Sequence, residues 1–193
     1  MVAVRINGTE APIRSQGLSR MPELIELVKS WIDPEHMITH LLIEGREFEE
    51  EDWGASLNRY ETAILEVETD TPANFVRDRF AQSWNVIQSC MTEFRDARLS
   101  FQSGNTIDGN KKLVKAVQTL QAFFDWYGAL MELVPPAGRA AYDISPQVRE
   151  LIEVCKHICQ QQLYQSWWAL GEALEKEMEP KLETLGQVCR NFH

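Results

Sequence analysis

The sequence predicts an α+β protein made of a small N-terminal sheet domain, residues 1–70, and a C-terminal helical bundle, residues 71–193. Three observations support this prediction: two indicate the division, and the third indicates a packed core. Apolar and polar residues alternate over short, turn-rich stretches in the first part, as they do in half-buried strands. From Thr71 onward the apolar residues recur every three or four positions, as in amphipathic helices. Finally, 44% of the residues are hydrophobic and six are Trp, which is enough for a packed core.

The first elements expected are two short strands and a helix. The stretch "VAVRI" alternates and ends at Asn7-Gly8, a strong signal for a two-residue hairpin turn. The second strand of this hairpin is expected to include residues 11–14. A helix is then expected to begin between Ser19 and Pro22 and to stop at Asp33-Pro34, because the residue before a proline avoids helical backbone angles.

Two further strands complete the sheet domain and give it the order β-β-α-β-β. The run "HLLIEG" is apolar and ends at a glycine, so it predicts a buried strand. The stretch "TAILEVET" alternates, and its Ala63, Leu65 and Val67 are therefore expected to face the core together.

The second part predicts an antiparallel bundle of three long helices, and a short fourth helix after them is left open. Thr71-Pro72 places a capping residue before a proline at the first helical position. Ser103-Gly104-Asn105 and Pro135-Pro136 are stop signals, and the short connections favour antiparallel neighbours. Pro180 is expected to kink or break the third helix. The three helices are expected at residues 71–102, 108–134 and 145–179.

The charge of the chain excludes two classes of partner. The formal net charge is −10, and residues 1–72 hold 6 Lys and Arg against 15 Asp and Glu, a net of −9. A nucleic-acid binder needs clustered basic residues, and so does a protein that binds an anionic membrane surface. No signal peptide and no apolar run of about 20 residues is visible. The expected location is therefore cytoplasmic, with the four cysteines reduced.

Three stretches of the first part share a pattern with a known family. They are "IELVKSWI" (Ile25–Ile32), "LLIEGREFEE" and "LNRYETAILEV". They resemble, in turn, the helix, the third strand with its turn, and the tyrosine-bearing loop with the final strand of ubiquitin and ubiquitin-like domains. The resemblance covers about a third of the chain and implies a β-grasp fold for residues 1–70.

The sequence departs from ubiquitin where ubiquitin acts. A conjugated modifier needs a flexible tail ending in Gly-Gly, whereas here the last strand runs through Thr69-Asp70 into the helix that begins at Thr71-Pro72. The apolar patch that ubiquitin uses to bind its receptors would include position 66, and this position is Glu66. Conjugation is therefore not expected. The helical part is similar, in architecture only, to bacterial export chaperones of the flagellin-chaperone type.

The acidic block "EFEEEDW" is interpreted as a solvated loop. Calcium loops need acids at fixed spacing with a glycine turn, and that pattern is absent. Catalytic carboxylates need unequal environments in a cleft, which a solvated run does not provide. A surface that attracts a basic partner, with Glu49, Glu50 and Glu51, is the alternative, and a metal site is the least favoured.

The cysteines and histidines suggest no active site. Cys155 and Cys159 of "CKHIC" lie four residues apart on one expected helix face, with His157 on another, and buried cysteines in a core are the favoured interpretation. A redox or metal role is the alternative. The remaining histidines are His36, His40 and the terminal His193. The sequence pattern pairs none of them with a candidate nucleophile.

Aromatic residues give the sharpest hypothesis about function. "FFDWYGALM" contains Phe123 and Trp126, "QSWWALG" contains Trp167 and Trp168, and Trp84 belongs to the first long helix. Core packing explains most of such side chains. A groove for a partner helix or peptide is the alternative, and any of these aromatics left exposed would mark it.

The sequence therefore predicts a non-catalytic protein–protein interaction module, an adaptor or a chaperone-like protein. The expected partner is another protein, and a homodimer is possible; no nucleic acid, no membrane and no cofactor is expected. The first alternative is a domain that binds a small molecule or peptide in an apolar pocket between sheet and bundle. An enzyme is the third reading, because no constellation of catalytic residues supports it.

Overall fold

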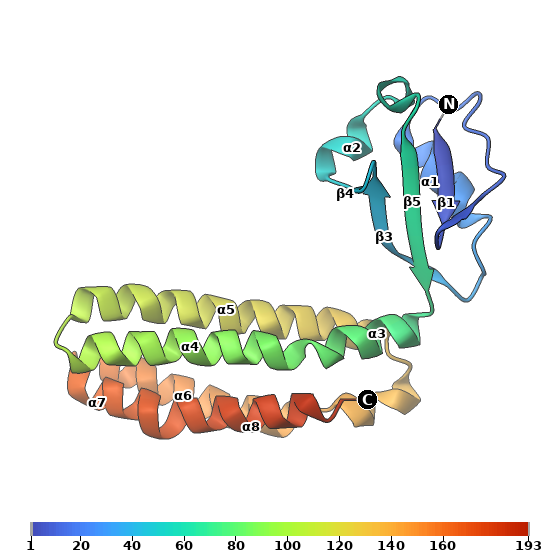
Figure 1. The fold of residues 1–193 in the computed structure, drawn as a ribbon. Coiled ribbons are helices and arrows are strands. Elements are labelled where there is room, and N and C mark those ends of the chain that lie inside the picture. The colour runs from blue at the N-terminus through green and yellow to red at the C-terminus, as the bar shows by residue number, and fades with distance from the viewer. Residues whose placement is uncertain (1, 193) are drawn as a thin grey trace. The chain divides into compact units, whose positions relative to one another are not determined.

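The computed structural model describes residues 2–192, which form an α+β chain divided into two compact units (Figure 1). The first unit ends at Phe75 and the second begins at Val76, within helix α3 (Pro72–Ala81). No helix among the described residues is both long and apolar enough to cross a membrane.

The N-terminal unit is a five-stranded mixed sheet with a helix on one face. The strand order is β2-β1-β5-β3-β4, in which β1 and β5 run parallel and the other neighbours run antiparallel. The helix α1 packs Leu24, Ile25 and Val28 against the sheet, which it covers from behind in Figure 1. The elements are β1 (Ala3–Ile6), β2 (Thr9–Glu10), α1 (Met21–Lys29), β3 (Met37–Ile43), β4 (Arg46–Glu47), α2 (Glu50–Gly54), the 3₁₀-helix η1 (Leu57–Tyr60) and β5 (Ile64–Asp70).

Local sequence signals account for most of this unit. Asn7 and Gly8 both have positive φ, as a two-residue hairpin turn requires, and they join β1 to β2. The alternation in β5 is also confirmed, since Leu65 and Val67 are buried in the core next to Ala63. The opposite face of the sheet carries the ion pairs Arg5–Glu66 at 3.8 Å and His40–Glu68 at 3.2 Å.

Two expectations for this unit are wrong. Residues 11–14 form no strand, because β2 ends at Glu10 after two residues. The acidic block is not one solvated loop: Arg46–Glu47 pair with β3 as a fifth strand, and residues 50–54 form α2. Such short elements have no hydrophobic period of their own, so tertiary contacts specify them.

The helical unit is built around α4. This helix packs against α5 on one side and against α7 and α8 on the other, as Figure 1 shows, while α6 packs against α7, the π-helical segment η3 and α8. The elements are α3, α4 (Ser83–Gln102), α5 (Thr106–Leu133), the 3₁₀-helix η2 (Pro136–Tyr142), α6 (Ser145–Leu163), α7 (Trp167–Ala173), η3 (Leu174–Met178) and α8 (Glu179–Arg190).

The expected third helix is wrong in its length and in its end. Instead of running to Glu179, α6 ends at Leu163, and the chain turns at Gln165, whose φ is +53°. Pro180 does not break a helix, because α7, η3 and α8 follow one another without interruption. The wider π turn just before Pro180 accommodates a residue that has no N–H and whose ring would crowd an ordinary preceding turn. The last helical segment is therefore long, not short.

Candidate functional site

An apolar groove lies between α5 and α6. It consists of two adjoining cavities of about 270 and 730 Å³ that share Val117, Cys155 and Cys159. Phe94 of α4 and Met178 of η3 are buried beneath the smaller cavity. The remaining lining residues are Leu113, Val114, Gln118, Leu120, Gln121 and Phe124 of α5, and Val148, Leu151, Ile152, Lys156, Ile158, Gln160 and Gln162 of α6.

The groove exists because α5 and α6 do not pack closely on each other. Both helices are held by other elements, α5 by α4 and α6 by α7, η3 and α8. Aliphatic side chains on their facing sides consequently stay in contact with solvent. Val114 is 52% exposed, Val117 is 45% exposed and Ile152 is 47% exposed. Grouped apolar exposure of this kind is typical of binding surfaces.

One end of the groove is closed by a hydrogen bond. The Gln162 side-chain amide donates to Asn110 Oδ1 at 2.8 Å, which ties the end of α6 to the first turns of α5. From Val114 to Phe124 the groove follows ten residues of α5, or about 15 Å at 1.5 Å per residue. It therefore has room for about three turns of another helix.

The borders of the groove are polar. Glutamine amides line it from both helices, at Gln118, Gln121 and Gln160. Lys156 also lines it and forms an ion pair with Glu153 at 2.7 Å. An apolar floor with polar borders is the usual anatomy of a protein interface.

Two thiols belong to the groove and two to the core. Cys159 is exposed and Cys155 is half-buried, so the expectation of buried core cysteines is wrong for Cys159. Burial raises the pKa of the Cys155 thiol, and it raises the pKa values of Cys90 and Cys189 to about 11. All three therefore stay protonated at neutral pH and are poor nucleophiles.

This placement predicts two reactive thiols in the native protein and four after unfolding. Cys159 should react first with a soluble thiol reagent, Cys155 more slowly, and Cys90 and Cys189 only in denaturant. Reaction requires that the reagent can reach the sulfur and that the thiol is deprotonated. Counting released chromophore against time checks this. Cys159→Ser should remove the fast phase alone; a fast phase that persists in this variant would contradict the open groove.

The five aromatic residues singled out in the sequence do not form one surface. Phe123 is buried, and Trp126 lies against it with ring centroids 5.8 Å apart. Trp167 stacks on Phe101 at 5.8 Å, and Trp84 is covered by the Arg190 guanidinium at 3.9 Å. Trp168, by contrast, is 69% exposed, next to the exposed turn with Leu163 and Tyr164. None of the five lines the groove.

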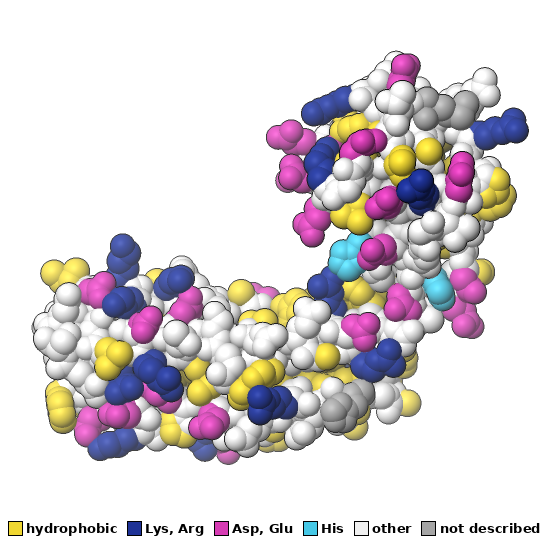
Figure 2. Space-filling model, viewed as in Figure 1, with side chains coloured by type: hydrophobic (Ala, Val, Ile, Leu, Met, Phe, Trp, Pro, Cys, Tyr) yellow, Lys and Arg dark blue, Asp and Glu magenta, His cyan; other side chains and the backbone are white. Residues whose placement is uncertain are grey.

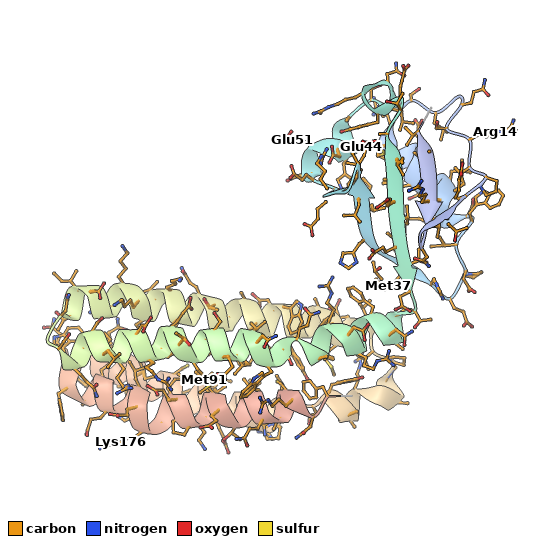
Figure 3. All side chains as sticks on the ribbon, viewed as in Figure 1. Arg14, Met37, Glu44, Glu51, Met91 and Lys176 are labelled. Atoms are coloured by element: carbon orange, nitrogen blue, oxygen red, sulfur yellow. The ribbon has the colours of Figure 1, made fainter. Side chains whose placement is uncertain are left out.

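The acidic residues singled out in the sequence lie on the N-terminal unit. Glu49, Glu50 and Glu51 are exposed at the start of α2, and Figure 3 shows Glu51 beside the β4 edge of the sheet. Acidic side chains are prominent on this unit in Figure 2, whereas both signs mix on the helical unit. A T-shaped aromatic pair, Phe48 and Trp53, lies among the acids with centroids 5.1 Å apart.

Asp52 differs from the other acids of the block, because its side chain is buried. The two terminal nitrogens of the Arg46 guanidinium, Nη1 and Nη2, donate to it at 2.8 and 2.7 Å, and the backbone N–H of Glu49 donates at 2.9 Å. The Tyr60 hydroxyl also donates to Asp52. The Arg46 hydrogen bonds hold the pKa of Asp52 well below its usual range, and burial raises the pKa of Tyr60. This cluster joins β4, α2 and η1, and its chemistry is structural.

The residues that line the groove gave a partial signal in the sequence. Two apolar rows run along α6. One, with Leu151, Val154 and Ile158, is buried, and its Leu151 and Ile158 form part of the groove floor. The other, with Ile152 and Cys159, is exposed in the groove. The width of the apolar stripe could have indicated a second contact. The sequence could not tell which row the bundle covers.

The remaining candidate ligands do not converge. His157 Nδ1 lies 2.9 Å from Glu177 of η3, away from the cysteines, and His193 lies outside the described residues. Within residues 2–192, no three His, Cys, Asp or Glu side chains are arranged to hold a metal ion.

Comparison of the chain with family models, curated proteins and solved structures gave no match.

Proposed function

We propose that this protein is a non-catalytic protein–protein interaction module, an adaptor or a chaperone-like protein, which docks its partner in the α5–α6 groove. The observation that supports this proposal is the row of exposed aliphatic side chains on both sides of the groove. A helix laid between α5 and α6 would cover them in the way that an amphipathic helix fills an apolar groove. The residues proposed to carry binding are Val114, Val117, Phe124 and Ile152.

The gain from covering these side chains is large enough to support specific binding. Fully burying a Val or Ile side chain contributes about 1.5–3 kcal/mol, so finishing the burial of three half-exposed ones contributes several kcal/mol. The polar groups that line the groove are thiols, side-chain amides and Lys156. Nucleophilic catalysis needs a general base next to the nucleophile, and this set of groups does not provide one. Binding without catalysis is therefore the role that its side chains favour.

A small apolar ligand is the second candidate for the same groove. The larger cavity, about 730 Å³, falls within the range of pockets that bind small molecules. This alternative differs from the pocket expected between sheet and bundle, because α5 and α6 alone form its walls.

We further propose that the N-terminal unit is a ubiquitin-like β-grasp domain. Its strand order, β2-β1-β5-β3-β4 with a parallel central pair and one helix across the sheet, supports this. In this proposal Glu66 is paired with Arg5 on the face that ubiquitin uses for receptors, which argues for a partner other than a ubiquitin receptor. Glu49, Glu50 and Glu51 remain a candidate surface for a basic partner.

The docking proposal predicts the effect of a charge placed in the groove. Val117→Asp should abolish capture of the partner from an extract of the native host, because an uncompensated carboxylate would be buried at the centre of the interface. The matched control is Leu99→Asp, a half-exposed aliphatic residue of α4 outside the groove, which should leave capture unchanged. Mass spectrometry of the captured proteins, with melting curves for both variants, is the measurement.

Two outcomes would overturn the docking site. One is capture of the same proteins by wild type and Val117→Asp. The other is loss of capture in Trp168→Ala with Val117→Asp unaffected, which would move the site to the exposed Trp168 turn.

A further inference from the structure

The two borders of the groove carry charges of opposite sign at its open end. On α5, Asp125 and Glu132 are exposed and seven residues apart, and they are displaced by about 80° and 60° from the groove residue Val117. On α6, Arg149 and Lys156 are exposed, also seven residues apart, and Lys156 lines the groove. Glu153, which pairs with Lys156 at 2.7 Å, is an acidic residue on the same side of α6. Residues seven apart share one helix face.

Asp125, Arg149 and Lys156 border the open half of the groove, and Glu132 lies about 12 Å beyond Phe124 along α5, at 1.5 Å per residue. The smaller cavity brings Leu113 near Gln162, and the larger one brings Phe124 near Val148, so α5 and α6 run antiparallel. The sequence neighbours of Phe124 and Val148, Asp125 and Arg149, therefore lie on opposite borders at the same level. Asp125 thus faces Arg149 across the apolar floor, and Lys156, itself paired with Glu153, is the second basic group on the α6 border.

We infer that the occupant of the groove is an amphipathic helix of another protein, with basic side chains on the flank that faces α5 and acidic side chains on the flank that faces α6. This inference rests on the proposed docking function. The apolar stripe of such a helix would contact Val117 and Ile152, and its flanks would meet charges of opposite sign. The charges also fix the direction in which a given helix binds, since reversing the helix exchanges its flanks.

A helix fits this site better than the other possible occupants. An extended peptide would bring unpaired N–H and C=O groups to a floor of aliphatic side chains and thiols, whereas a helix satisfies its own backbone groups. In a symmetric dimer of this chain, the two grooves would face each other, and because both are concave, neither floor would be covered. The length of about 15 Å matches about three helical turns.

The charges should tune affinity rather than create it. Exposed ion pairs contribute little each, and salt screens them, so matched flanks should tighten binding about three- to tenfold at low salt and much less at high salt. The apolar floor should supply the rest.

Designed peptides test this inference, with Cys159 as a built-in reporter. Three helical peptides of equal length share one Leu stripe and carry mixed, all-basic or all-acidic flanks. Each is titrated against the full chain, and protection of Cys159 from a maleimide is followed. Wild type should prefer the mixed peptide. The variant with Asp125→Lys and Glu132→Lys, whose borders are both basic, should prefer the all-acidic peptide.

A matched variant separates border charge from net charge. Asp96→Lys with Glu183→Lys changes the net charge equally, at two exposed positions outside the groove, and should keep the preference of wild type. Equal protection by all peptides in all variants would overturn the charge inference and leave the docking function standing.

Failure of every peptide to protect Cys159 would overturn both the inference and the helix-docking function. If a fatty acid protects Cys159 and no peptide does, the groove binds a small apolar ligand instead of a helix. Protection that rises with protein concentration, with dimers seen in sedimentation, would identify a second copy as the occupant and overturn the inference.

Discussion

Replacing Asp52 by Asn is expected to destabilise the N-terminal unit by about 1–3 kcal/mol, because it breaks an ion pair between a buried carboxylate and the half-exposed Arg46 and leaves polar groups unmatched. Asp52 is the shared acceptor of Arg46, Tyr60 and the Glu49 N–H. An amide in its place turns one acceptor oxygen into a donor that faces Arg46, which has donors only.

Hydrogen exchange of the β3 and β5 amides in the full chain measures this effect without interference from the helical unit. Glu51→Gln is the matched control, because Glu51 is the exposed neighbour of Asp52 and should leave exchange unchanged. Equal exchange in the Asp52→Asn variant and wild type would mean that the cluster contributes nothing to stability.

The same residue predicts an acid sensitivity. The pKa of Asp52 is lowered on folding, so its contribution is complete above the unfolded pKa of about 3.9 and is lost as the pH falls below that value. Wild type should therefore lose stability in the N-terminal unit below about pH 4, and the Asp52→Asn variant should lack this part of the decline. Parallel acid dependence in the two proteins would contradict the assignment.

Replacing Gly186 by Val is expected to destabilise the helical unit by about 3 kcal/mol through overpacking. A Cβ atom at this position of α8 would lie 2.7 Å from Cε3 of Trp84 on α4, and 3.2 Å from a methyl carbon of Ile87. The Trp84 ring contacts α8 at Gly186 and again at the Arg190 guanidinium, and these two contacts restrict its movement. The close approach of α4 and α8 therefore depends on the missing side chain.

Helical circular dichroism in urea measures the change, and two comparisons isolate its cause. Gly128→Val in α5, where nothing lies within 4 Å of the added atom, should change stability by less than about 0.5 kcal/mol. Adding Trp84→Ala to Gly186→Val should recover part of the loss, as a double-mutant cycle requires for residues in contact. If the stability change of the double variant equals the sum of the changes in the two single variants, the packing argument is refuted.

The local pattern of the sequence determined the elements whose signals are contained in a few residues. Asn7-Gly8 set the first hairpin because few residues accept positive φ at both positions. The alternation around Leu65 and Val67 set which face of β5 is buried, because side chains in a strand repeat every two residues. The stop at Ser103-Gly104-Asn105 likewise ended α4 where a glycine with positive φ follows the helix.

Only the tertiary structure decided the features that depend on partners distant in the chain. Asp52 resembles its exposed neighbours in sequence, and it is buried because Arg46 and Tyr60 come to it from other elements. No Gly or Pro marks the end of α6 at Leu163; the chain turns at Gln165, and the following helix α7 packs on both α4 and α6. The groove arises in the same way: Val117 and Ile152 belong to apolar stripes like any core residue, and they are exposed because α5 and α6 are held apart by the helices on which each one packs.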